Sequence, residues 1–377
     1  MNTLINNNPY NKINTFCLAA IIFISASPLF ENLEKIVYTF ICLFPLLFFN
    51  RIKSNKSDLI ILLLLIFSLF IYGFVLDFIR THEIDFINFG FIISIFPAYL
   101  LSCLETKDHF FYANEKLVNW SILLGIPIFL LIRFFPSILE FSFSYNFDGF
   151  NHKTFIITNI HYTEEGKLSD RFVGFGREPG LTQLFYILAL WSRLNRNGRI
   201  TMPVILIIIA IVLGRSTAGL FTMLLVILIN FPFKKNLKYI LLFSPIAVYF
   251  LISQINFHIE NKLAGSNSFI NRYERYITFF ISDIKYILFG YGNAFYKKSI
   301  GISDLGGWDT FLQLSQRYGI ITFALISLLL FLNNPKYTTV SLIIFITFFS
   351  QLIWFYPAIA FFYFNGKSEP KTLGNLK

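Results

Sequence analysis

The sequence predicts an all-α polytopic integral membrane protein. Of its 377 residues, 55% are hydrophobic and only 14% are charged, and the mean hydropathy is +0.63. Soluble globular chains carry about 25% charged residues. Several apolar runs also reach the roughly 20 residues that a helix needs to cross a hydrocarbon core of about 30 Å. Residues 1–377 are therefore expected to form a single membrane-embedded domain.

Hydropathy places ten membrane spans, at about residues 13–30, 33–49, 58–76, 86–104, 117–135, 179–194, 200–213, 216–232, 238–256 and 309–332. A last apolar stretch, 338–364, is too long for one ordinary span and too short for two full ones. One tilted helix and two short helices broken near Gln351–Pro357 both fit this stretch. The chain is thus expected to cross the membrane eleven or twelve times.

The distribution of Lys and Arg predicts the orientation, because basic short loops stay in the cytoplasm. The loops after the second, sixth and eighth spans fall on one side by parity and are basic; they contain Arg51, Lys53, Lys56, Arg193, Arg196, Arg199, Lys234, Lys235 and Lys238. The C-terminal segment prefers the same side, which favours twelve crossings; it contains Lys367, Lys371 and Lys377. The N-terminus is then cytoplasmic, and the two longest loops, 136–178 and 257–308, are external.

Each long external loop has a local pattern, and loops of this length are usually functional or disordered rather than spacers. In the first, the β-branched run Thr154–Ile160 and the segment Arg171–Phe175 flank a turn at Glu164–Lys167, which predicts a small hairpin. In the second, Asn271–Leu288 alternates aromatic and aliphatic residues with charges at helical spacing. This pattern predicts an amphipathic helix at the membrane interface.

The net charge of +10 does not indicate a nucleic-acid partner, because the basic residues are spread among short loops rather than gathered on one face. The three cysteines, Cys17, Cys42 and Cys103, lie inside apolar spans and form neither a disulfide framework nor a metal-binding spacing. The five histidines also lack ligand spacing, and the sequence predicts no cofactor.

The segment Arg171–Gly180 contains two arginines, one glutamate, three glycines and a proline at the end of the first long loop. A guanidinium suits phosphate oxygens, and glycines let a backbone approach a ligand closely. A helix that begins near Pro179 would also aim its free amides at an anion. Arg171 and Arg177 are therefore candidate phosphate ligands, or else they reach the membrane surface or pair with Glu178. Glu178 is either a helix cap, or a base or a residue that orients the arginines.

Two further basic positions are expected on the external face. Arg215 lies in a polar turn between two apolar runs, where it is either a third phosphate contact or part of a simple tight turn. Its neighbours Ser216 and Thr217 are candidate hydroxyl donors. Arg272 and Arg275 lie one helical turn apart and share a face. They either bind phosphate or anchor the second loop to anionic lipid head groups.

Asp309 opens the late span at 309–332, where it is either a helix N-cap or a candidate general base close to the arginines. A diphosphate is the single anion that would explain the whole external set, Arg171, Arg177, Arg215, Arg272 and Arg275. No Asp-x-Asp pair marks a Mg²⁺ site. Arginines, rather than a metal, are therefore expected to stabilise a leaving diphosphate.

These motifs resemble those of the bacterial O-antigen polymerases and ligases, most closely the Wzy-type polymerases. The resemblance covers about residues 170–325 and rests, in order, on Arg171–Gly180, Gly214–Gly219, Arg272 with Phe289–Gly292, and Asp309–Gly319. It implies a multi-pass glycosyltransferase of the inner membrane, surrounded by lipid, with two large periplasmic loops and an active site facing the periplasm. In such systems chain-length control usually involves a partner protein, for which no docking motif is visible.

The resemblance implies one of two glycan transfers from undecaprenyl diphosphate. A polymerase transfers the growing glycan to a lipid-linked repeat unit, whereas a ligase transfers it to lipid A-core. Ligases of this group typically carry a histidine followed by Asn, Ser or Gln where this chain has Asp309–Thr310, and the distance to Gly319 is one residue short. This departure favours a polymerase. A flippase or transporter for the lipid-linked oligosaccharide is less expected, because the polar residues gather externally rather than deep in several spans.

In the expected reaction the acceptor hydroxyl attacks the anomeric carbon and undecaprenyl diphosphate leaves. Asp309 or, failing that, Glu178 takes the proton of the hydroxyl. The donor diphosphate is bound by Arg171, Arg215 and Arg272, with Arg177 and Arg275 in support.

Overall fold

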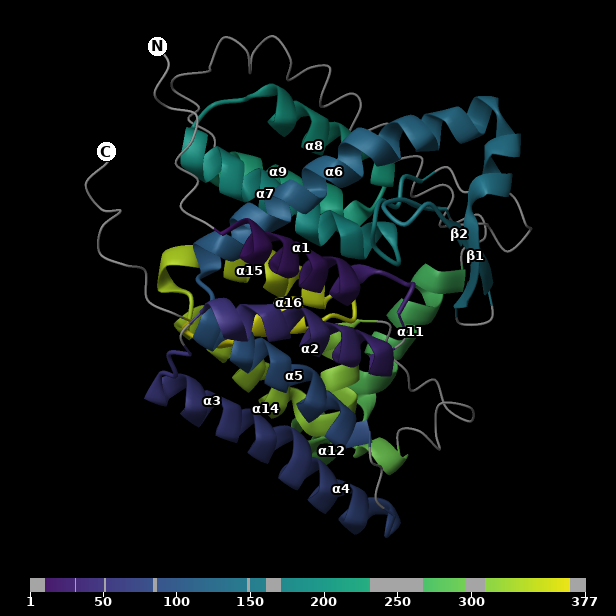
Figure 1. The fold of residues 1–377 in the computed structure, drawn as a ribbon. Coiled ribbons are helices and arrows are strands. Elements are labelled where there is room, and N and C mark those ends of the chain that lie inside the picture. The colour runs from purple at the N-terminus through teal and green to yellow at the C-terminus, as the bar shows by residue number, and fades with distance from the viewer. Residues whose placement is uncertain are drawn as a thin grey trace.

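The computed structural model describes residues 11–30, 32–50, 52–83, 87–147, 150–160, 171–230, 267–295 and 309–366. Over these residues the chain is mostly helical, as predicted (Figure 1). The first half contains α1 (Lys12–Ala26), α2 (Asn32–Phe49), α3 (Lys56–Ile66), α4 (Tyr72–Thr81), α5 (Ile87–Leu104), α6 (Lys107–Phe134) and strands β1 (Phe143–Phe147), β2 (Phe150–Thr154) and β3 (Asn159–Ile160). The second half contains α7 (Pro179–Asn197), α8 (Met202–Gly214), α9 (Thr217–Asn230), α11 (Asn267–Ile281), α12 (Ile284–Phe289), α14 (Thr310–Leu332), α15 (Thr338–Phe348) and α16 (Pro357–Ala360).

Each predicted span within the described residues is helical, and the run at 238–256 lies outside them. One boundary differs clearly. α6 begins at Lys107, well before the predicted residue 117. The reason is a side-chain cap, because the Thr106 hydroxyl accepts the His109 amide at 3.2 Å and starts the helix in a polar stretch.

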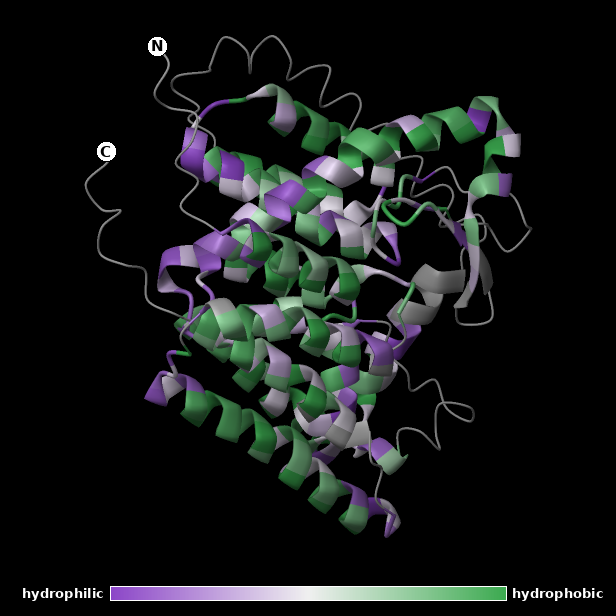
Figure 2. Cartoon of the chain, in the orientation of Figure 1, coloured by the Kyte–Doolittle hydropathy of each residue, from purple (hydrophilic) through white to green (hydrophobic). Residues whose placement is uncertain are grey.

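Three described helices are long and apolar enough to cross a membrane: Lys56–Thr81, α6 and α14. The first of these joins α3 to α4 through a π-helical segment, Phe67–Ile71. Figure 2 shows hydrophobic residues along most of its length and hydrophilic residues at its ends. Large apolar side chains such as Leu63 and Ile79 are exposed on it. Such a surface favours aggregation in water, whereas hydrocarbon solvates it.

The two ends of the bundle differ in the way that the loop charges predict. In Figure 1 the start of α3 and the end of α7 lie at the left, whereas the sheet and α11 lie at the right. The end of α7 carries Arg193 and Arg196, which pair with Glu115 of α6 at 3.5 and 2.8 Å. In the described part of the chain, the basic residues after the second and sixth predicted spans therefore lie at the opposite end from the sheet and α11.

The first long loop contains a hairpin, but the predicted position is wrong. β1 pairs antiparallel with β2, and β2 with β3. The overlooked signal is the alternation of aromatic and polar residues over Phe143–Phe147. The predicted turn at Glu164–Lys167 lies outside the described residues. The two segments predicted to pair, Thr154–Ile160 and Arg171–Phe175, still meet at one point, where the Asn159 amide donates to the Gly174 carbonyl at 2.7 Å.

The amphipathic segment predicted at 271–288 is helical but divided. α11 ends at Ile281 and α12 begins at Ile284, with Asp283 between them. Tyr276 stacks on Phe311 of α14 with ring centroids 5.7 Å apart, so α11 lies against the beginning of α14. The location of this segment at a membrane interface stays a prediction.

Helix α14 is interrupted at Gly319, whose φ of 84° and ψ of 160° are not helical. The break frees the carbonyls of Gln316 and Arg317. They accept the backbone amides of Tyr291 and Gly292, at 2.7 and 3.0 Å. The segment after α12 is thus docked through its backbone onto the middle of α14.

The last apolar stretch consists of two short pieces, one of the two alternatives that its length allows. α15 ends at Phe348 and α16 begins at Pro357. The loop between them is held by the start of α14, because the Thr310 amide and hydroxyl both donate to the Gln351 carbonyl, at 3.1 and 2.7 Å.

Candidate functional site

The segment 171–178 is irregular but firmly attached at both ends. The Phe172 amide donates to the Leu213 carbonyl at the end of α8, at 3.0 Å. The Arg177 amide donates to the Ala26 carbonyl at the end of α1, at 2.9 Å. The segment therefore crosses the end of the bundle from the α8–α9 turn to α1.

Two glycines in this segment are required sterically. Gly174 has a φ of 67°, and a Cβ there would collide with the Tyr186 hydroxyl. Gly176 donates its amide to the Thr182 hydroxyl at 3.0 Å, and a Cβ would collide with that same hydroxyl. These two glycines therefore let the segment pack closely on α7. Their expected role in letting the backbone approach a ligand stays a prediction.

Arg171 and Arg215 lie close together although 44 positions separate them in the sequence. Arg215 has a left-handed φ of 48° in the two-residue turn between α8 and α9. The hydrogen bond from Phe172 to Leu213 holds the neighbouring Arg171 beside that turn. Arg171 is exposed as a whole residue. Even so, burial of its guanidinium is the main cause that lowers the pKa of Arg171, and the positive charge of Arg215 is the second.

Glu178 occupies the N-cap position of α7, but its side chain makes no capping hydrogen bond, so the prediction of a cap is wrong. The carboxylate pairs instead with Arg177, with Nη2 and Oε1 3.2 Å apart. This ion pair is one of the alternatives that the sequence offered for Arg177 in place of a phosphate contact; the role of Glu178 as a base or as an orienting residue stays a prediction. Pro179 is the first helical residue, as predicted, and it has no amide hydrogen that needs a partner.

Lys35 is a member of this region that the sequence interpretation missed. It lies in the first turn of α2, is 6% exposed, and its charge is close enough to that of Arg177 for the two to repel. Its Nζ is 4.9 Å from the centre of the Tyr356 ring. A charged residue at the end of an apolar run can indicate a functional site. Lys35 was overlooked because hydropathy places it within the predicted span 33–49.

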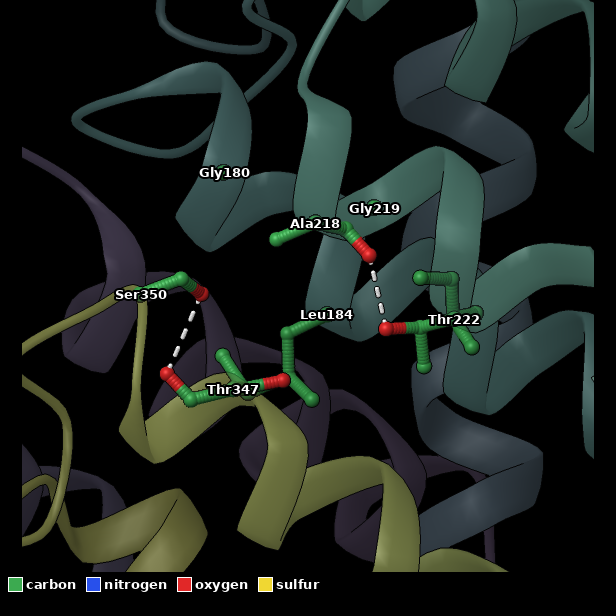
Figure 3. A pocket seen from close by; sticks show the side chains of 8 residues that line it. Gly180, Leu184, Ala218, Gly219, Thr222, Thr347 and Ser350 are labelled. Carbon is green, nitrogen blue, oxygen red and sulfur yellow. Dashed lines mark hydrogen bonds between the residues drawn. The ribbon is translucent and has the colours of Figure 1, made fainter. Parts of the chain in front are cut away.

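A small recess opens between the starts of α7 and α9 and the end of α15 (Figure 3). Its walls include Gly180 and Gly219, and polar groups come from Thr222, Thr347 and Ser350. Its free volume is only about 10 Å³, which is room for about one water molecule. The recess as it stands is therefore too small for a diphosphate or a sugar.

The starts of α7 and α14 are linked through Gln351. A Cβ on Gly180 would collide with the Gln351 side-chain amide, so these two residues are in close contact. The carbonyl of Gln351 is the acceptor for Thr310. The N-termini of α7 and α14, each the positive end of a helix dipole, thus lie close to Gln351.

Asp309 is a helix N-cap, as one of its two predicted roles requires. Its Oδ1 accepts the Leu312 amide at 2.9 Å, and the residue is fully buried. Its second predicted role, as a base, stays a prediction. Thr310 connects it to Gln351 and hence to the Arg177 side of the site.

Arg272 and Arg275 both lie on α11, but the side chain of Arg272 lies outside the described part of the chain. Arg275 is partly buried. The next residue, Tyr276, stacks on Phe311, two positions after Asp309. This packing brings α11 to the start of α14; a shared anion with Arg171 and Arg215 stays a prediction.

Among the described residues, no three His, Cys, Asp or Glu side chains are grouped so that they could hold a metal ion. The site is instead basic, and its positive groups come from arginines, one lysine and helix N-termini. Comparisons of this chain with protein-family models, curated proteins and solved structures find no match.

Proposed function

We propose that this chain is a glycosyltransferase of the bacterial inner membrane that polymerises O-antigen. It transfers a growing glycan from undecaprenyl diphosphate to a lipid-linked repeat unit at the periplasmic face. The eleven or twelve crossings and the two periplasmic loops belong to the same proposal. Two observations support the proposal. The helix Lys56–Thr81 has an exposed apolar surface, and the basic end of α7 lies at the opposite end of the bundle from the sheet and α11.

The observation that carries the proposal is the approach of Arg171 to Arg215. Two guanidiniums that lie together and are partly removed from water destabilise each other, because water no longer screens their charges. A bound anion replaces this repulsion with two attractions. The fork of each guanidinium matches phosphate oxygens, and the beginnings of α7 and α9 add amide donors beside it.

The proposed chemistry uses these positive groups in the transition state. The acceptor hydroxyl attacks the anomeric carbon of the donor, the new glycosidic bond forms, and the bond from that carbon to the diphosphate oxygen breaks. Negative charge develops on the departing diphosphate, and the fixed arginines stabilise it. Because this stabilisation comes from the side chains themselves, the transfer is proposed to be metal-independent.

Two carboxylates remain candidates for the base that receives the hydroxyl proton. Asp309 is buried and already accepts the Leu312 amide, whereas the Glu178 side chain is 40% exposed beside Arg177. A base has to reach the hydroxyl of an incoming acceptor. Exposure therefore favours Glu178 over Asp309, which reverses the order expected from the sequence.

A deletion strain tests the proposed function through the banding pattern of its lipopolysaccharide. A polymerase defect leaves molecules with a single repeat unit, and wild-type protein restores the ladder of long chains. Loss of all antigen with lipid-linked units in the periplasm would indicate a ligase instead. Units stranded on the cytoplasmic face, detected by lectin accessibility, would indicate a flippase.

A further inference from the structure

A second pair of positive charges, Lys35 and Arg177, lies at the end of α1. Three attachments from distant parts of the chain assemble it. The Arg177 amide donates to Ala26 at 2.9 Å. The Ala358 amide donates to the Ser25 hydroxyl at 3.4 Å, which holds the Tyr356–Ala358 turn against the same helix end. Tyr356 then presents its ring to the Lys35 ammonium at 4.9 Å.

This pair is costly to maintain in the absence of an anion. Lys35 is 6% exposed, so its ammonium has lost most of its water, and the guanidinium of Arg177 repels it. The Tyr356 ring offsets only part of this cost. Glu178 pairs with Arg177 at 3.2 Å. An anion beside Lys35 and Arg177 would be attracted by both side chains.

The Lys35–Arg177 pair and the Arg171–Arg215 pair are attached to different elements. The first belongs to the end of α1, the start of α2 and the turn before α16. The second consists of Arg215 in the turn between α8 and α9 and of Arg171, which the Phe172–Leu213 hydrogen bond holds beside that turn. The recess in Figure 3 lies between the starts of α7 and α9, and Arg177 and Arg215 each precede one of these helices by two positions. One member of each pair therefore lies at this end of the bundle.

We propose that the Lys35–Arg177 pair binds the diphosphate of a second polyprenyl lipid, the acceptor, while the Arg171–Arg215 pair binds the donor. The inference rests on the proposed function, because a polymerase of this kind joins two lipid-linked substrates. The donor loses its diphosphate when the glycosidic bond forms, and the acceptor keeps its own. Each diphosphate stays at the membrane surface, so two separate basic sites are needed on one face.

Binding stoichiometry tests this assignment in the full-length purified protein. The probe is farnesyl diphosphate, a short polyprenyl diphosphate, and native mass spectrometry in detergent counts the molecules bound per chain. We expect two on the wild type, one on Lys35→Met and one on Arg215→Met. Lys35→Arg, which keeps the charge, is expected to keep two, and so is the control Lys53→Met, whose side chain is exposed.

The outcomes separate this inference from the proposed function. One molecule on the wild type that is lost in Arg215→Met and kept in Lys35→Met overturns the second site and leaves the polymerase proposal intact. No binding to the wild type contradicts both. In a transfer assay, Lys35→Met is expected to raise the KM for the lipid-linked acceptor about tenfold with kcat unchanged, the signature of lost binding; a raised donor KM instead would overturn the assignment.

Discussion

Thr310 and Gln351 are joined by two hydrogen bonds to one atom: the amide and the hydroxyl of Thr310 both donate to the Gln351 carbonyl, at 3.1 and 2.7 Å. The same hydroxyl accepts the Ile353 amide at 3.0 Å. One threonine therefore fixes the loop after α15, and this loop places the Gln351 side chain against Gly180 at the start of α7.

Thr310→Val is accordingly expected to destabilise the protein by about 1–3 kcal/mol, because the methyl group leaves a buried amide and a buried carbonyl short of one partner. Thr310→Ser keeps the hydroxyl and is the matched control. Unfolding in detergent measures the difference. Equal stability of the two variants would show that the loop does not depend on this hydroxyl.

The break in α14 yields a prediction about glycines. Gly319 has a φ of 84° and a ψ of 160°, and a Cβ there would collide with the Leu288 carbonyl. Gly319→Ala is expected to cost more than the about 1–3 kcal/mol of such backbone strain, because the docked segment after α12 must also move. The purified yield and the unfolding midpoint check this.

Gly198 is the control for that substitution. It has a positive φ of 57°, but an added Cβ meets no atom within 4 Å. Gly198→Ala should therefore cost only about 1 kcal/mol, the strain of a left-handed alanine. A Gly319→Ala protein as stable as Gly198→Ala would contradict the docking of Tyr291 and Gly292 on α14.

Helices and their order could be predicted because a run of apolar side chains shows its length directly in the sequence. The beginning of α7 at Pro179 and the cap at Asp309 were also predictable, since both are local backbone preferences. The early start of α6 was not found, because a capped polar turn has no hydropathy signal. The hairpin was misplaced because the alternation of aromatic and polar residues over Phe143–Phe147, which indicates a strand, was overlooked.

The candidate site could be predicted only in part. The arginines were visible as charges beside apolar runs, but their grouping depends on long-range contacts such as Phe172 with Leu213. Lys35 was hidden inside a span, and its relation to Arg177 arises from tertiary packing. Gly174 and Gly176 were predicted to let the backbone approach a ligand. The structure shows that a larger residue at either position would collide with Tyr186 or Thr182, a contact that the sequence did not indicate.

Loss of either member of the first basic pair should reduce polymerisation strongly. Arg171→Ala and Arg215→Ala each remove charge-assisted hydrogen bonds worth about 1.5–3 kcal/mol, or about 10- to 150-fold in transfer rate. Cells that carry them are expected to make mainly single-repeat lipopolysaccharide. Arg199→Ala, on an exposed residue after α7, is the control and should leave the ladder unchanged. A wild-type ladder of long lipopolysaccharide chains from a well-expressed Arg171→Ala protein would contradict the assignment of Arg171 to diphosphate binding.

The double variant refines this test. If Arg171 and Arg215 bind one phosphate group, the effect of removing both should be smaller than the sum of the two separate free-energy losses, because the second arginine is already ineffective when the first is gone. Transfer rates of the four proteins in membranes give the coupling. Strict additivity would mean that the two arginines act at separate anions.

Two isosteric changes distinguish the candidate bases. Asp309→Asn removes a charge but keeps an oxygen that can accept the Leu312 amide, and asparagine is as good an N-cap as aspartate, so the fold should persist. Glu178→Gln removes the charge that pairs with Arg177 without changing the size of the side chain. If Glu178 receives the proton, Glu178→Gln should lower kcat by about 100-fold or more, whereas Asp309→Asn keeps kcat near the wild-type value. The reverse result would assign the base to Asp309. Loss of the Arg177 partner alone would raise KM and leave kcat unchanged, so the two constants separate proton transfer from positioning.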